Sequence, residues 1–244
     1  MFHTFFYEPI YNLLVVVLTF VPLHDIGTAI VVVTLIVKFF LLPLNLSALR
    51  TQYLMKRLEG EMNKIKELQK TKPQEASKMM IEMYRREKVN PFASLFTVIL
   101  QIPIFFALYF VFSKGLYSDP NSLYSFVHFP EKLHTLAFGI FDVTHTKNIF
   151  IAILVGLSSY TLARRQTVGM VTEKKSHEES FQDQFMKSMK IQLLYVLPVI
   201  IGVSSFALPS ALGLYWFTTN IIGYLQDVYM KNKLAHLHPD KTHK

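Results

Sequence analysis

Long apolar runs alternate along the chain with shorter polar segments, and this pattern predicts a bundle of membrane-spanning helices. Residues 27–46 read GTAIVVVTLIVKFFLLPLNL, about 20 residues, which is enough to cross a hydrocarbon core of roughly 30 Å. Similar runs follow, and each predicts a further span: residues 91–113, 148–164, 191–208 and 209–230. The fold class predicted is therefore an all-α integral membrane protein with five transmembrane helices.

A lysine interrupts the first of these spans. At about 100° per residue, Lys38 shares one narrow face of the helix with Gly27, Thr34 and Asn45, while Val, Ile, Leu and Phe cover the rest. A charged residue at this depth normally faces a bundle interior or a watery cavity. The alternative interpretation is that the ammonium snorkels to the membrane interface.

The second and last spans also carry polar faces. Ser94, Thr97 and Gln101 fall within about 60° of one another, and Trp216 and Asn220 share a face of the last span with Gly213, Gly223 and Asp227. Gln101 could line a cavity with Lys38, or it could hydrogen-bond between helices. Trp216 is expected to face Lys38 and Gln101 and not lipid.

The first 26 residues predict an external helix that lies in the membrane interface. Aromatic and aliphatic residues recur there at helical spacing, and His3, Glu8 and Asn12 interrupt them. The alternative is a true span over residues 10–21, a run that is short for crossing a bilayer.

Residues 47–90 differ sharply from the spans, because they contain 11 Lys or Arg and six Asp or Glu. Apolar residues at helical spacing predict two amphipathic helices, with a break at Lys72 and Pro73. Methionine suits contact with varied apolar partners, or these side chains pack the hairpin against itself. The methionines concerned are Met55, Met62, Met79, Met80 and Met83.

Charge orients the chain. Lys and Arg gather in the hairpin, in the loop 165–190 and in the basic tail 231–244, but they are sparse in residues 1–26 and in the loop 114–147. The positive-inside rule places the first group in the cytoplasm and the second outside. An external N-terminus and a cytoplasmic C-terminus require an odd number of spans, which five satisfies.

Composition narrows the classes of function. With 51% hydrophobic residues and a mean hydropathy of +0.30, the chain is not a soluble domain, and the absence of cysteine excludes disulfides and thiolate chemistry. No nucleophile motif, phosphate loop or metal-ligand spacing is present, so no enzyme, cofactor or metal is expected. A small transporter or channel with an anion on Lys38 is one alternative, although the internal repeats typical of transporters are missing. A subunit of a larger assembly is a third possibility.

The arrangement resembles the YidC/Oxa family of membrane protein insertases, in particular bacterial members without the large periplasmic domain. The resemblance rests on the order and spacing of VKFFLLPL, NPFASLFTVILQIPIFFALYFVF and LPSALGLYWFTTNIIGYLQ. It implies a hydrophilic groove that opens to the cytoplasm and to lipid, with a basic residue in the first span. Lys38 matches that position, where arginine is usual, so the charge is kept and the planar five-donor fork is lost.

The resemblance also implies the function and the partners. The chain is expected to be a multi-pass chaperone of the bacterial inner membrane that inserts nascent membrane proteins as a monomer, alone or with the Sec translocon, the ribosome and the signal recognition particle pathway. Lipids are the other expected contact. Lys38, Thr34, Gln101, Thr97, Trp216 and Asn220 would form the groove, and the five methionines would capture clients.

Overall fold

The computed structural model is mostly helical and consists of two compact units. One unit comprises Met1–Phe40 and Ile99–Tyr224, and the other comprises Leu41–Val98 and Leu225–Lys244. The structure describes residues 1–88, 90, 92–116, 119–167 and 187–237. Most of the predicted loop 165–190 and the end of the predicted tail 231–244 lie outside the described residues.

In the first unit, the N-terminal helix packs on the helix that carries Lys38. A π-helical turn, η1 (His3–Tyr7), leads into α1 (Glu8–Phe20), and a 3-10 turn, η2 (Pro22–His24), precedes α2 (Ile26–Phe40). Tyr11, Leu14 and Leu18 are fully buried along α1, and α1 lies against α2. These contacts place α1 within the first unit.

A helix break interrupts the predicted span 27–46. α2 ends at Phe40, and α3 (Leu42–Arg57) begins after Leu41. Pro43 explains the break, because proline has no N–H to donate to the carbonyl of Phe39 and its ring would clash with that carbonyl. The predicted span 27–46 is therefore divided between α2 and α3 and is not one continuous helix.

The segment between α6 and α7 is short of regular structure and is tied to the start of α2. It contains η3 (Pro120–Ser122) and an antiparallel pair, β1 (Leu136–Ala137) and β2 (Phe141–Asp142). The Asp25 carboxylate accepts hydrogen bonds from the N–H groups of Gly27 and Phe138, at 2.7 and 2.9 Å. Asp25 thus caps α2 and anchors the strand pair at the same time.

Hydrogen bonds also order the strand pair itself. Burial raises the pKa of Asp142, but hydrogen bonds from Thr144 and Thr135 outweigh it, so this pKa lies below the ordinary value.

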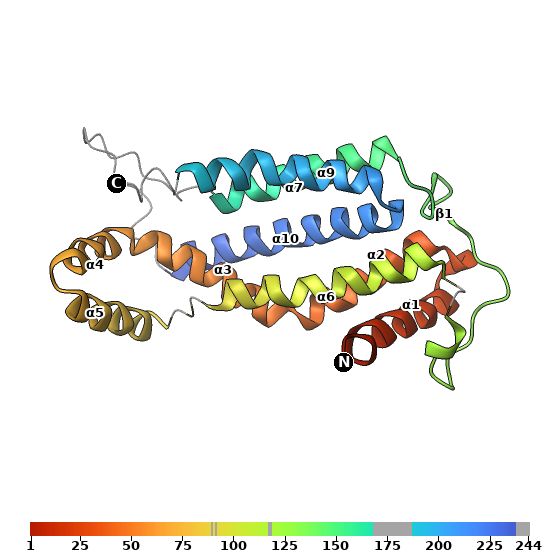
Figure 1. Cartoon of the computed structure of the whole chain (residues 1–244), viewed down its shortest axis with the longest axis horizontal. Helices are drawn as coiled ribbons and strands as arrows, with labels where there is room; N and C mark the ends of the chain where they lie inside the picture. The colour runs from red at the N-terminus through yellow and green to blue at the C-terminus, as the bar shows by residue number, and fades with distance from the viewer. Residues whose placement is uncertain (89, 91, 117–118, 168–186, 238–244) are drawn as a thin grey trace. The chain divides into compact units, whose positions relative to one another are not determined.

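The remaining long helices are α6 (Phe92–Lys114), α7 (Ile149–Thr167), α9 (Leu197–Ala207) and α10 (Ser210–Leu237), with a π-helical turn, η4 (Gln192–Val196), before α9. α7 and α9 lie side by side (Figure 1). Among the described residues, one helical run, Lys187–Ala207, is long and apolar enough by itself to cross a membrane. α2 and α3 meet this criterion only as a broken pair.

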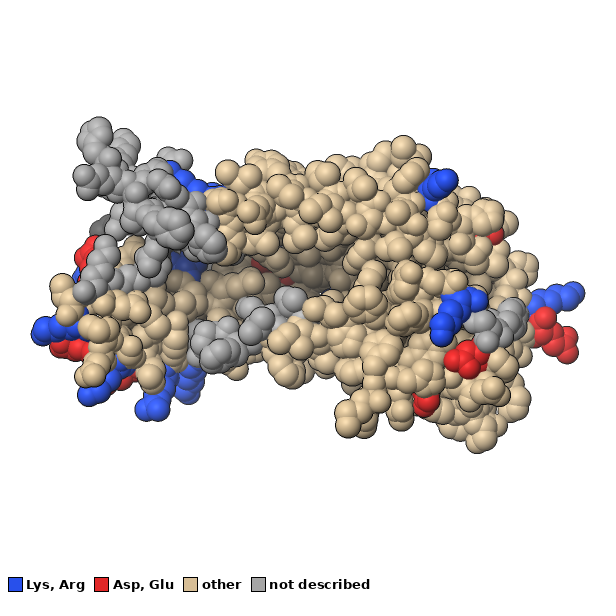
Figure 2. All heavy atoms as spheres, viewed as in Figure 1, with Lys and Arg blue, Asp and Glu red and all other residues tan. Residues whose placement is uncertain are grey.

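The second unit holds a helix pair, α4 (Glu59–Thr71) and α5 (Pro73–Arg86), and the break predicted at Lys72 and Pro73 is observed. Charged side chains cover this pair (Figure 2), and its interior is a cluster of apolar residues, Met62, Ile65, Ala76 and Met83. A second cluster joins α3 to the end of α10 through Leu49, Met230 and Leu234. Next to that cluster, the Tyr53 hydroxyl donates to the carboxylate of Asp227 at 2.9 Å.

Candidate functional site

Three helices bring polar side chains of the first unit together around Lys38. The ammonium Nζ of Lys38, on α2, donates to Oε1 of Gln101, on α6, at 3.4 Å. The Gln101 amide nitrogen donates in turn to the hydroxyl of Tyr215, on α10. Lys38, Gln101 and Tyr215 form what we call the polar cluster.

The helix α2 buries its polar residues Thr34 and Lys38, and it leaves large apolar residues exposed on its other side. Lys38 is only 9% exposed and Thr34 is buried, whereas Phe39 is 70% exposed and Leu35 is also exposed. A helix in water shows the opposite arrangement. In a bilayer, a buried charge and an exposed apolar face are the expected combination.

Lys38 is bound by an amide and not by a carboxylate. Within the described part of the chain, no Asp or Glu forms an ion pair with it, and the Thr34 hydroxyl donates to its own helix, at Ile30 O, 2.6 Å away. An ammonium has three donors, and a buried charge without an opposite charge is costly. The site is therefore suited to an incoming oxygen ligand, above all a carboxylate.

Trp216 is placed next to the polar cluster by stacking. Its ring lies on Phe105 of α6, with ring centroids 4.9 Å apart and an angle of 15° between the planes. Phe105 follows Gln101 by one helical turn, so Trp216 contacts the α6 face that carries Gln101.

The side-chain hydrogen bonds of Asn220 lead to α7 and not to the polar cluster. The Asn220 amide donates to the hydroxyls of Ser158 and Ser159 on α7, at 3.0 and 2.8 Å. It therefore joins α10 to α7, as polar side chains do between membrane helices. Thr97 belongs to the second unit. The groove roles of these two residues stay predictions.

Sequence reasoning missed Tyr215 and Phe105. Phe105 could have been found from its spacing, since it lies four residues after Gln101 on the same helix face. Tyr215 precedes Trp216 in the sequence, but its bond to Gln101 joins residues 114 apart. Helical periodicity within one segment contains no signal for such a pairing.

The hairpin methionines divide into buried and exposed positions. Met62 and Met83 belong to the interior of the α4–α5 pair, and Met55 and Met80 pack against it while partly exposed. Met79 is 41% exposed, and its neighbour Ile81 is exposed as well. The burial of Met62 and Met83 favours the interpretation in which they pack the hairpin, so capture from solution would fall to Met79 and its neighbours.

Comparison with known proteins gives a consistent result. The family model described as 60Kd inner membrane protein matches residues 17–237. A membrane protein insertase YidC of Fusobacterium nucleatum is 30% identical over 93% of this chain and 98% of its own length. YidC proteins of Oceanobacillus iheyensis and Campylobacter jejuni are 27% and 31% identical over 85% and 88% of this chain, and over 75% and 36% of their own lengths. The resemblance seen in the sequence motifs is thus confirmed, and the chain belongs to the 60Kd inner membrane protein family.

Proposed function

We propose that the chain is a membrane protein insertase, which places other membrane proteins in the bilayer and helps them fold. The observation that carries the proposal is the buried ammonium of Lys38, held by Gln101 on the inner face of a helix whose outer face is apolar. The names of the relatives support the same function. No covalent chemistry is required.

The polar cluster would act by lowering the free energy of a client's polar flank inside the membrane. A single Asp or Lys at the centre of a bilayer costs about 2.5–3.5 kcal/mol on insertion scales. A client carboxylate beside Lys38 would gain an opposite charge. Gln101 and Tyr215 would keep that charge within a hydrogen-bonded network. Trp216, stacked on Phe105, would form one wall of the groove.

The α4–α5 pair would make the first contact with a client in the cytoplasm. Its exposed charged side chains suit water, and Met79 and Ile81 offer apolar contact surface on α5. Flexible Met side chains adapt to clients of different sequence.

The topology proposed has five spans, with the N-terminus outside and the C-terminus in the cytoplasm of a bacterial inner membrane. It follows from the Lys and Arg of the hairpin, the 165–190 loop and the tail. The interfacial position of α1 is part of the same proposal. Partners would be nascent membrane proteins, with the Sec translocon, the ribosome and the signal recognition particle pathway as candidates.

Reconstitution tests the proposal. The purified chain is placed in liposomes, and a single-span client with an acidic external flank is synthesised beside them. Protease protection of the flank should appear with the chain and not in empty liposomes. Equal protection in both would overturn the insertase function. Uptake of small anions without client insertion would point to the transporter instead.

A further inference from the structure

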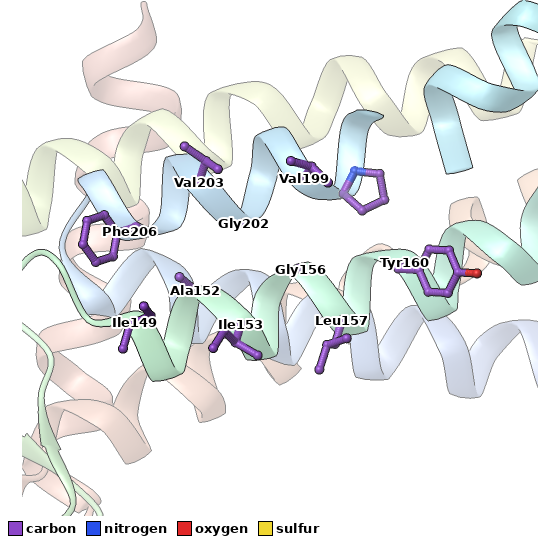
Figure 3. A pocket seen from close by; sticks show the side chains of 11 residues that line it. Ile149, Ala152, Ile153, Gly156, Leu157, Tyr160, Val199, Gly202, Val203 and Phe206 are labelled. Carbon is purple, nitrogen blue, oxygen red and sulfur yellow. The ribbon is translucent and has the colours of Figure 1, made fainter. Parts of the chain in front are cut away.

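An apolar cleft runs along the outer surface of α7 and α9. None of the residues that line it belongs to the polar cluster. Its volume is about 530 Å³. Figure 3 shows the side chains that flank it on the two helices. The lining residues are Ile149, Ala152, Ile153, Gly156, Leu157, Tyr160, Pro198, Val199, Gly202, Val203 and Phe206. The Tyr160 hydroxyl is the one polar side-chain group among them.

Small residues form the floor of the cleft and bulky ones its walls. A Cβ on Gly202 would lie 3.4 Å from the Gly156 Cα, so the two backbones approach closely there. Ile153 and Leu157 on one side, and Val199 and Val203 on the other, remain more than half exposed. Tightly docked membrane helices use small residues at their contact. Here the two glycines already face each other, so the surface left over is aliphatic and suits a flexible chain.

Two basic residues, Arg164 and Lys190, lie in the helices beyond the Tyr160 end of the cleft. The Tyr160 ring packs near that of Tyr195, with centroids 6.0 Å apart. Arg164 follows Tyr160 by four residues, so it lies on the same face of α7, and it is exposed. Lys190 precedes Tyr195 by five residues, about 8 Å along the axis of the helical run Lys187–Ala207 that contains both, and it is partly exposed.

We propose that the cleft binds an acyl chain of an anionic phospholipid whose phosphate lies against Arg164 and Lys190. From Arg164 to Ile149 is 15 residues of α7, about 22 Å. This is longer than the hydrocarbon of one leaflet, about 15 Å, so one extended chain can lie along the helix. Cationic side chains at helix ends bind anionic headgroups, which supplies the charge complementarity. The site lies outside the polar cluster and does not depend on client insertion.

Lipid binding by the purified full chain tests the proposal. Native mass spectrometry in detergent micelles counts the dioleoyl phosphatidylglycerol and the dioleoyl phosphatidylcholine retained. Val203→Trp should fill the cleft and lower phosphatidylglycerol retention about tenfold. Ile200→Trp is the matched control, since Ile200 is an exposed residue of α9 that does not line the cleft. It should bind as the unchanged chain does.

The charge arm uses a second matched pair. Arg164→Gln with Lys190→Gln should remove the preference for phosphatidylglycerol, while Lys147→Gln, beside the other end of the cleft, should leave it unchanged. Equal retention by Val203→Trp and Ile200→Trp would overturn the site. A loss in Lys147→Gln alone would overturn the headgroup position. If Val203→Trp does not fold, Leu157→Trp fills the cleft from α7 and allows the same comparison.

Discussion

The helix pairs α4–α5 and α7–α9 are both made of two adjacent helices, but different kinds of residue hold each pair together. In α4–α5, Met62, Ile65 and Met83 fill the interior, and charged residues cover the outside. In α7–α9, Gly156 and Gly202 bring the backbones together, and aliphatic side chains such as Val203 point outward.

The difference indicates the solvent of each pair. In water, the hydrophobic effect drives large apolar side chains into an interior. In lipid this driving force is missing, and helices associate by close backbone packing and by hydrogen bonds such as those from Asn220 to Ser158 and Ser159. The same chain therefore contains one pair packed as helices pack in water and one packed as helices pack in lipid.

Amide hydrogen exchange in lipid nanodiscs should show the largest contrast between the two pairs. The α4–α5 pair has a small apolar interior and many exposed residues, so its amides should exchange orders of magnitude faster than those of α7 and α9. Mass spectrometry of peptides from both pairs measures the ratio. Equal protection would contradict the difference in solvent between the two pairs.

Removing an interior side chain should cost most in the water-exposed pair. Ile65 is fully buried, and Ile65→Ala should lower the stability of the hairpin by about 2–5 kcal/mol. Ile81→Ala, at an exposed position of α5, is the control and should change little. The opening free energies from hydrogen exchange of α4 and α5 compare the two. A small loss for Ile65→Ala would mean that the cluster does not hold the pair together.

Adding a side chain at a glycine should destabilise the α7–α9 pair and not the α4–α5 pair. At Gly202, a Cβ meets the Ala152 carbonyl oxygen at 3.3 Å, whereas at Gly60 of α4 nothing lies within 4 Å. Gly202→Leu should therefore destabilise by about 1–3 kcal/mol through overpacking. Gly60→Leu should be neutral or stabilising, since a helical glycine is unfavourable. Thermal unfolding in detergent reports both, and an equal Tm for the two variants would contradict close packing at Gly202.

The smallest effect is expected from the surface ion pair of the hairpin. Arg86 donates to Glu61 at 2.6 Å, but both side chains are exposed. Exposed pairs are screened by salt and contribute little. Arg86→Gln should leave the exchange of α4 and α5 unchanged at physiological salt. A loss as large as that of Ile65→Ala would show that charge, and not the apolar interior, holds the pair.

Local patterns in the sequence were sufficient for part of the fold. Proline marks the break before α5, and apolar runs mark the long helices. The break at Leu41 was not predicted, because an apolar run of this length indicates one helix, whereas Pro43 disfavours helix in the turn before it. The β1–β2 pair was also missed, since two-residue strands leave no periodic signal.

The candidate site was predicted in part for a similar reason. Lys38 and Gln101 stand out as polar residues in apolar helices, and the structure joins them. Tyr215 has both an apolar ring and a polar hydroxyl, so it does not stand out in an apolar helix. Its role depends on a contact between segments that are distant in the sequence. Asn220 shares a helix face with Trp216, yet its amide bonds to α7 while the Trp216 ring stacks on α6. The two residues therefore share a helix face but contact different helices, which helical periodicity does not predict.

The central claim is that the buried charge of Lys38 serves the polar flank of a client, and a charge series at this residue tests it most directly. Insertion into liposomes is measured for a client with an acidic flank and for a matched client with an uncharged flank. Lys38→Arg should retain insertion of both clients, because the charge is kept. Lys38→Gln should slow the acidic client, and Lys38→Glu should reduce it at least about tenfold with little effect on the uncharged one. Normal insertion of the acidic client by Lys38→Glu would contradict the account.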